Sequence, residues 1–465
     1  GSDIALNYDL QANINTNNGL ASTFSWVASA DNPSVTGESL APVATAFITD
    51  DLVNTSNVDQ VVVYNVTPSS GGCTGDVFTV TVTVRPEPVG VPVAATRCSD
   101  VVLGAGFTLN TNGTSVSAAT YNITNINNGG LTASAGAPAT GTVFTANVFT
   151  DDAGTNQTGV SVNVVYTVVP VSSAGCLGAS FLMTATIDPE PATQAPIVRP
   201  ALCSDVATGF TMAVAGASSY TISTNSNGLV QSAGTVSAGS GKAANELADD
   251  AWTNATAATV NVIYTVTPVA GTCNGDVFTV TVPILPEPRG SNVAIATGSD
   301  IALNYDLQAN INTNNGLAST FSWVASADNP SVTGESLAPV ATAFITDDLV
   351  NTSNVDQVVV YNVTPSSGGC TGDVFTVTVT VRPEPVGVPV AATRCSDVVL
   401  GAGFTLNTNG TSVSAATYNI TNINNGGLTA SAGAPATGTG FTANVLTDDA
   451  WTNQTGVSVN VVYTV

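Results

Sequence analysis

The chain has 465 residues, of which only 8% are charged, with Lys+Arg 7 against Asp+Glu 32, a formal net charge of -25 and no histidine. So few cations cannot neutralise a phosphate backbone, which excludes nucleic-acid binding, and the sequence holds no run of 18 apolar residues that could span a bilayer. The absence of histidine removes the commonest general base and metal ligand, so we expect no enzyme. A chain rich in Val, Thr, Ser and Asn, with 43 Gly and 23 Pro, predicts an all-β protein.

Internal repeats dominate the sequence. Residues 1–168 recur at 298–465 with three differences: Val143 against Gly440, Phe149 against Leu446, and Gly154 against Trp451. A Ser-Asp pair marks a shorter unit of about a hundred residues, with its aspartates at Asp3, Asp100, Asp205, Asp300 and Asp397. We therefore expect four full units and a fifth that ends before its last hairpin, in a stretch of a longer protein.

Within the first unit, the earliest clear element is a central strand at Thr23–Val27, which aligns with Thr120–Thr124 and Ser219–Ser223 in the next two units. A hairpin closes the unit. Its strands are expected at Val61–Pro68 and Asp76–Arg85, around a Gly-rich turn at 69–75. In the second strand Phe and Val alternate with Thr, which is typical of a strand with one buried and one solvated face.

A Pro-Glu-Pro segment follows each full hairpin, beginning at Pro86, Pro189, Pro286 and Pro383. Proline holds the chain extended and cannot donate to a strand ladder, so these segments predict semi-rigid linkers. The expected domains are 1–95, 96–197, 198–295, 296–392 and a truncated 393–465. About seven short strands per hundred residues predict immunoglobulin-like β-sandwiches, strung end to end as an extended rod.

The hairpin motif resembles one known family. The matching stretches are Tyr64–Pro68 with Cys73–Val84, and Tyr264–Pro268 with Cys273–Val280. They look like the PKD-like repeats of large Bacteroidetes surface adhesins exported by type IX secretion, such as the giant gliding-motility adhesin. The resemblance implies an extracellular, bacterial cell-surface stalk of many repeats, with no catalytic activity.

The seven cysteines recur at two places in the unit, its start and its last hairpin turn. In an immunoglobulin-like sandwich both places are expected at the same pole. We therefore expect each unit to close its own disulfide, Cys98–Cys176 and Cys203–Cys273, in an oxidising compartment. Gly1 and Gly298 take the first position in units 1 and 4, which leaves Cys73 and Cys370 without a partner. Reduced, buried thiols are the alternative.

Carboxylates also recur near the expected junctions. Calcium-binding clusters of the kind found in tandem arrays would use oxygen ligands from several of them, and the candidates are Asp50, Asp51, Glu87, Asp100, Asp151, Asp152, Glu190, Asp205, Asp249, Asp250, Glu287, Asp300, Asp347, Asp348, Glu384 and Asp397. The alternative is that Asp51 and its equivalents cap a short helical turn. The six arginines all flank linkers, which predicts ion pairs between neighbouring units.

The sequence therefore favours a structural stalk that projects a distal binding region and bears force. Its partners would be the neighbouring repeats and, through regions outside this chain, surface polysaccharide or other cells. Two alternatives stay open: a carbohydrate-binding array attached to a secreted hydrolase, and a subunit of a self-assembling extracellular fibre. Carbohydrate binding would require exposed aromatic side chains, and strand alternation is expected to bury most of them.

Overall fold

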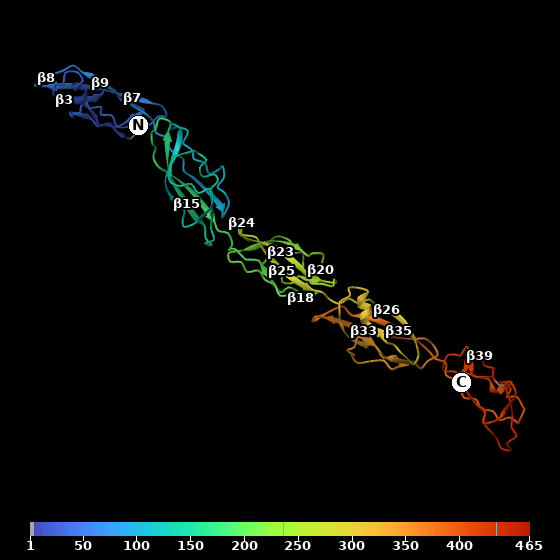
Figure 1. Ribbon diagram of the computed structural model, residues 1–465. Helices are drawn as coiled ribbons and strands as arrows, with labels where there is room; N and C mark the ends of the chain where they lie inside the picture. The colour runs from blue at the N-terminus through green and yellow to red at the C-terminus, as the bar shows by residue number, and fades with distance from the viewer. Residues whose placement is uncertain (1–3, 236, 434) are drawn as a thin grey trace.

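The computed structural model describes residues 4–235, 237–433 and 435–465. Five units follow one another in a single row, and the chain does not fold back on itself (Figure 1). Each of units 1 to 4 has its own buried cluster of aliphatic and aromatic side chains, and unit 5 has a smaller one. The chain is thus an extended rod of β-sandwiches, as the sequence predicts.

Unit 1 contains a four-stranded sheet, a three-stranded sheet and a two-stranded ribbon. Its elements are β1 (Ile4–Ala5), β2 (Tyr8–Asp9), α1 (Leu10–Asn15), β3 (Thr23–Ala28), β4 (Val35–Thr36), β5 (Phe47–Ile48), β6 (Asp51–Asn54), β7 (Gln60–Ser70), β8 (Cys73–Thr74) and β9 (Phe78–Val84). The expected central strand and closing hairpin are β3 and β7–β9. The short helix was not expected; Asp9 caps it by accepting from the backbone N–H groups of Gln11 and Ala12.

Unit 2 has a five-stranded sheet in the order β10-β16-β15-β11-β13 and a two-stranded ribbon, β12-β14. The strands are β10 (Val93–Cys98), β11 (Ala118–Asn127), β12 (Thr132–Ala135), β13 (Gly141–Phe144), β14 (Ala153–Thr155), β15 (Val162–Ser172) and β16 (Phe181–Asp188). Along β15 and β16 buried side chains alternate with less buried ones. This alternation is the pattern that predicted the hairpin.

Unit 3 repeats the arrangement of unit 2, with β17 (Ile197–Val198), β18 (Leu202–Cys203), β19 (Ser219–Asn225), β20 (Val230–Ala233), β21 (Gly239–Lys242), β22 (Ala251–Thr253), β23 (Val260–Ala270), β24 (Cys273–Asn274) and β25 (Phe278–Leu285).

Unit 4 repeats unit 1 and adds a first strand, with β26 (Val293–Gly298), β27 (Ile301–Ala302), β28 (Tyr305–Asp306), α2 (Leu307–Asn312), β29 (Thr320–Ala325), β30 (Val332–Thr333), β31 (Phe344–Ile345), β32 (Asp348–Asn351), β33 (Gln357–Ser367), β34 (Cys370–Thr371) and β35 (Phe375–Arg382). Unit 5 contains η1 (Ala402–Phe404), β36 (Tyr418–Ile420), β37 (Asn422–Asn424), β38 (Thr429–Ala432), β39 (Gly438–Phe441), β40 (Ala450–Thr452) and β41 (Val462–Thr464).

The first strand of a unit runs parallel to its last strand. In unit 2, β10 pairs with β16 from Val93↔Met183 to Cys98↔Asp188, and β26 pairs with β35 in the same way in unit 4. Strands β10, β17 and β26 cross the boundaries expected at 95/96, 197/198 and 295/296. We therefore place the start of units 2 to 5 directly after the Pro-Glu-Pro segment that ends the preceding unit.

The parallel pairing decides where the cysteines lie. Cys98 is at the end of β10, beside the end of β16, so it lies at the pole of unit 2 that faces unit 3. Cys176 precedes β16 and lies at the opposite pole. The assumption that both cysteines of a unit share one pole is therefore wrong.

Candidate functional site at the unit junctions

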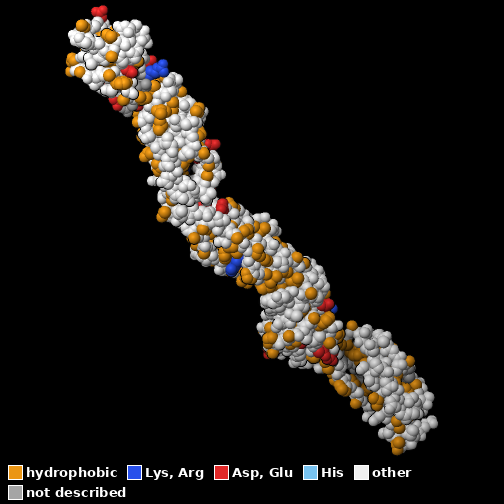
Figure 2. Space-filling view, turned by 60° about the vertical axis from the view of Figure 1, so that its left-hand side comes forward, with side chains coloured by type: hydrophobic (Ala, Val, Ile, Leu, Met, Phe, Trp, Pro, Cys, Tyr) orange, Lys and Arg blue, Asp and Glu red, His pale blue; other side chains and the backbone are white. Residues whose placement is uncertain are grey.

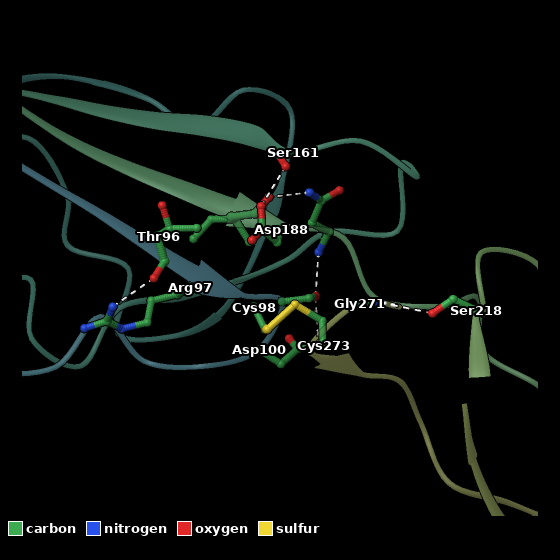
Figure 3. Close-up of a disulfide and its surroundings, with 12 residues drawn as sticks. Thr96, Arg97, Cys98, Asp100, Ser161, Asp188, Ser218, Gly271 and Cys273 are labelled. Atoms are coloured by element: carbon green, nitrogen blue, oxygen red, sulfur yellow. Dashed lines mark hydrogen bonds between the residues drawn. A yellow bond between two sulfur atoms is a disulfide. The ribbon is translucent and has the colours of Figure 1, made fainter. Parts of the chain in front are cut away.

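Two disulfides connect neighbouring units. Cys98 of unit 2 is bonded to Cys273 of unit 3, and Cys203 of unit 3 is bonded to Cys370 of unit 4. Figure 3 shows Cys98 at the end of β10 and Cys273 at the start of β24, which joins the two units at their facing poles. The expected pairs Cys98–Cys176 and Cys203–Cys273 are corrected to these inter-unit bonds, and Cys176 is a free, buried thiol.

The same pairing rule, in which each bond joins one unit to the next, explains the remaining cysteines. A first-strand cysteine bonds to the hairpin cysteine of the following unit, so the first-strand position that corresponds to Cys176 is residue 1. That residue is Gly1, which lies outside the described residues, and Gly298 takes the same position in unit 4. Cys73 and Cys395 are free and exposed. Junctions 2/3 and 3/4 are thus covalently linked, and junction 1/2 is not.

The hairpin turns of units 2, 3 and 4 each pack against the Pro-Glu-Pro segment before them. A Cβ added at Gly372 would lie 1.9 Å from the carbonyl oxygen of Pro288, and one at Gly178 would lie 1.8 Å from that of Pro88. Real Cβ atoms never come so close to backbone. Glycine is therefore required at this turn, because only glycine lets the hairpin sit directly on the linker.

Hydrogen bonds also link the units around the disulfides. At junction 2/3 Gln157 Nε2 of unit 2 donates to Thr193 of unit 3 and to Glu190 of the linker. The Thr193 hydroxyl in turn donates to Asp276 at 2.8 Å. At junction 3/4 Asn315 Nδ2 of unit 4 donates to the carbonyl of Glu287 at 2.7 Å. The glutamate of each of these two linkers is thus enclosed by groups of both neighbouring units.

Glu287 is a buried carboxyl, 5% exposed. Burial and then the nearby carboxylate of Asp205 raise its pKa to about 7, and Asp373 of unit 4 acts in the same direction. Burial, followed by Asp100 and Asp276, also raises the pKa of Glu190 at the preceding junction. Few cations are present to offset this repulsion, and charged side chains are sparse on the face shown in Figure 2.

A pH dependence follows from Glu287. Its carboxyl binds a proton more tightly in the folded state, where its pKa is about 7, than in the unfolded chain, where it is 4.5. Stability should therefore fall as the pH rises from about 5 to about 8, because the folded state must give up a proton that the unfolded state has already lost. Thermal unfolding across this range tests the sign.

Two variants isolate this effect. Glu287→Gln should flatten the profile, whereas Glu384→Gln, at an exposed glutamate, should leave it unchanged. Asp152, whose pKa burial raises to about 6, adds a residual slope of the same sign in both variants. Identical profiles for Glu287→Gln and the unmodified chain would contradict the assignment.

The structure does not gather the sixteen candidate carboxylates into calcium sites. It does bring Asp100 close to Glu190 and Asp205 close to Glu287. Among residues 4–235, 237–433 and 435–465, however, no three His, Cys, Asp or Glu side chains are placed to hold a metal ion. The calcium hypothesis is thus not supported. The Asp-Asp pairs do not converge at the junctions, because one aspartate of each pair is hydrogen-bonded within its own unit.

One aspartate of each pair is buried and accepts a hydrogen bond from a core tyrosine. In unit 1, Asp50 accepts from the Tyr64 hydroxyl at 2.7 Å and from Ser39, and in unit 3, Asp250 accepts from Tyr264 at 2.8 Å. The other members of this series are Asp152–Tyr166, Asp347–Tyr361 and Asp449–Tyr463.

The other aspartate of each pair is exposed: Asp51, Asp151, Asp249, Asp348 and Asp448. Asp51 and Asp348 begin strands β6 and β32. Asp51 and Asp348 therefore do not cap a helical turn. Of the remaining candidates, Glu384 and Asp300 are exposed, Asp397 accepts from Thr452, and Glu87 is half-buried.

Sequence reasoning missed an asparagine that recurs in every unit just before the strand that carries the core tyrosine. It is buried in units 1 to 4 and half-buried in unit 5. Asn254 is fully buried and donates from Nδ2 to the carbonyls of Ala258 and Ile284, at 2.9 and 2.7 Å. Its Oδ1 accepts from the backbone N–H and the hydroxyl of Thr256. Equivalent residues are Asn54, Asn156, Asn351 and Asn453. The signal was the recurrence of this asparagine four residues after the buried aspartate.

The expected ion pairs between units do not form. None of the six arginines makes an ion pair within the described residues; Arg97 and Arg394 instead donate to the carbonyls of Leu103 and Leu400. Arg199 lies 5.1 Å from the centre of the Phe210 ring. Among the described residues Lys242 forms an ion pair with Glu246, and both lie within unit 3.

Comparison with protein families matches a PKD-like domain four times, at residues 1–88, 96–191, 201–288 and 296–385. The chain belongs to the PKD-like domain family. No curated protein matches the chain. No helix among the described residues has the length and apolar character needed to cross a membrane.

Cadherin ectodomains are among the solved structures that are similar to this PKD-like array. The human desmocollin-1 ectodomain is 10% identical, with 98% of this chain and 91% of that chain covered and a TM-score of 0.25. Protocadherin gamma B2 domains 1–5 are 12% identical, with coverage of 91% and 87% and a TM-score of 0.20. Drosophila N-cadherin EC1–4 is 13% identical, with coverage of 78% and 93% and a TM-score of 0.16.

Proposed function

We propose that this chain is a force-bearing stalk segment of an extracellular bacterial surface adhesin. The observation that carries the proposal is the pair of disulfides that join one unit to the next, Cys98–Cys273 and Cys203–Cys370. A disulfide within a unit would stabilise that unit alone, whereas one between units also holds the units together when the chain is pulled. The arrangement of the units in one row is suited to the same task.

Disulfides persist in oxidising surroundings, which supports a location outside the cell. The hairpin motif, which resembles repeats of Bacteroidetes gliding-motility adhesins, supports export by type IX secretion and attachment to the cell surface. In this proposal the chain has no catalytic role, and its direct partners are the neighbouring repeats. Polysaccharide or another cell would be bound by regions outside this chain.

The distribution of aromatic side chains favours a stalk over a carbohydrate-binding array. Trp26, Trp323 and Tyr64 are at most 1% exposed. Among the described residues, three aromatic side chains are exposed by more than a third, Tyr8, Phe47 and Phe344, and they lie only in units 1 and 4. The described part of the chain therefore has no aromatic surface for sugars that is repeated in every unit.

Small-angle X-ray scattering tests the proposal. The oxidised chain should scatter as an extended rod, with a largest dimension close to that of five units placed end to end. The double variant Cys98→Ser/Cys203→Ser should stay extended but bend more at junctions 2/3 and 3/4, whereas Cys73→Ser should change nothing. A compact particle with its units folded back on one another would overturn the stalk.

A further inference from the structure

Unit 2 contains a cavity of about 180 Å³ beside Gly154. Apolar side chains provide most of its lining, among them Leu103, Ile126, Leu131 and Ile187, and the ring of Tyr166 also contributes. An apolar cavity of about 150 Å³ is large enough to bind an aromatic ring. The cavity lies between β14 and the sheet of unit 2.

The other units show what belongs in this space. The position of Gly154, two residues before the buried asparagine, is occupied by Leu52, Trp252, Leu349 and Trp451 in the other four units. Trp252 is 6% exposed, and its Nε1 donates to the Tyr264 hydroxyl at 2.9 Å. Trp451 donates to Tyr463 at the same distance. Unit 2 alone has no side chain at this position.

The polar end of the site is retained in unit 2. The Tyr166 hydroxyl donates to Asp152 at 2.9 Å, as Tyr264 does to Asp250. Its oxygen keeps a lone pair that can accept one further hydrogen bond, which in unit 3 comes from the indole N–H of Trp252. The tyrosine of unit 2 is therefore poised to accept an N–H group from outside the chain.

A second sequence difference between unit 2 and units 3 and 5 fills part of this space. Phe149 occupies the position of Leu247 and Leu446, and its ring lies 4.1 Å from that of Tyr166, centre to centre. The cavity persists beside it. A Cβ added at Gly154 would make only ordinary contacts, the nearest at 3.7 Å to the carbonyl oxygen of Thr132, so the backbone leaves room for a side chain at this position.

We propose that the cavity of unit 2 is a binding site for an indole ring, which takes the place that Trp252 fills in unit 3 and donates its N–H to the Tyr166 oxygen. The ring could be supplied by a free small molecule or by the tryptophan side chain of a peptide. Both sources present the same flat apolar surface and the same single donor.

Calorimetric titration of the full oxidised chain with indole tests the proposal. A second titration with N-acetyltryptophanamide tests whether a tryptophan side chain in a peptide binds in the same way. We expect one indole bound per chain. Indene, which has the same shape without the N–H, should bind several-fold more weakly because one hydrogen bond is lost. Tighter binding of N-acetyltryptophanamide than of indole would assign the site to a peptide, and the reverse to a free small molecule.

The double variant Phe149→Leu/Gly154→Trp reproduces the residues of units 3 and 5 and should lower the affinity more than tenfold. Gly154→Leu, which introduces the residue found in units 1 and 4, should do the same and serves if the double variant fails to fold. The larger groove of unit 5, about 1080 Å³, is unchanged in both variants. Any indole that binds there contributes equally to the titrations of the variants and of the unmodified chain. Absence of indole binding by the unmodified chain, or binding that both variants retain, would overturn the proposal.

Discussion

Reducing agent should lengthen the fully stretched chain by roughly 700 Å, at about 3.5 Å for each of about 200 released residues. With both disulfides closed, the shortest covalent path runs from residue 1 to Cys98, crosses to Cys273, returns to Cys203, crosses to Cys370 and continues to residue 465. The remaining residues lie in loops that force cannot extend. Single-molecule pulling before and after reduction measures the difference.

Matched cysteine variants separate the linked cysteines from the free ones. Cys98→Ser/Cys203→Ser should show the full length without reductant, whereas Cys73→Ser/Cys395→Ser should behave like the unmodified chain, because these thiols are free. Peptide mapping under non-reducing conditions should recover Cys98 joined to Cys273. Recovery of Cys98 joined to Cys176, or equal lengths before and after reduction, would contradict the inter-unit links.

Asn254→Ala should destabilise unit 3 by about 2–4 kcal/mol. The substitution leaves the carbonyls of Ala258 and Ile284 without their side-chain donor, and each buried polar group that loses its partner costs about 1–3 kcal/mol. The loop that begins at Asn254 would also lose the hydrogen bonds that fix its turn. Denaturant unfolding, followed by a probe in unit 3, measures the change.

Asn261→Ala is the control, since Asn261 is an exposed residue of β23, and it should alter stability by less than about 0.5 kcal/mol. Asn156→Ala should repeat the large effect in unit 2, where the equivalent side chain donates to Val160 and Ile187. Equal effects of Asn254→Ala and Asn261→Ala would show that the buried asparagine is not a stabilising centre.

The fold could be predicted from the sequence because its strongest signals are local. Alternation of Val and Thr in β9 identified a strand with one buried face, and the same pattern recurred in β35. Prolines on either side of Glu87 marked the end of a unit. The helix α1 was missed, because its six residues, Leu10–Asn15, are too short for a helical period to emerge from the sequence.

The disulfides could not be predicted because they depend on strand direction. The spacing of Cys98 and Cys176 is compatible with a bond inside the unit, and only the parallel pairing of β10 with β16 places these residues at opposite poles. The calcium hypothesis finds no support among the described residues for a related reason. Proximity in sequence placed Asp50 and Asp51 in one candidate site, whereas the alternation of an extended chain turns Asp50 into the core and Asp51 toward solvent.

Glycine at position 298 sets a length scale for any array built from this 297-residue block. A cysteine there would complete a link at every junction, and glycine leaves one junction in three held by the linker contact and hydrogen bonds alone. Such an array resembles a jointed polymer whose stiff segment is three units long, rather than a uniform rod. The mean end-to-end distance of a chain of freely jointed segments grows with the square root of the number of segments. Reduction of the disulfides would make the stiff segments shorter and more numerous. The mean end-to-end distance of the array would then fall, although the summed length of its folded units stays the same.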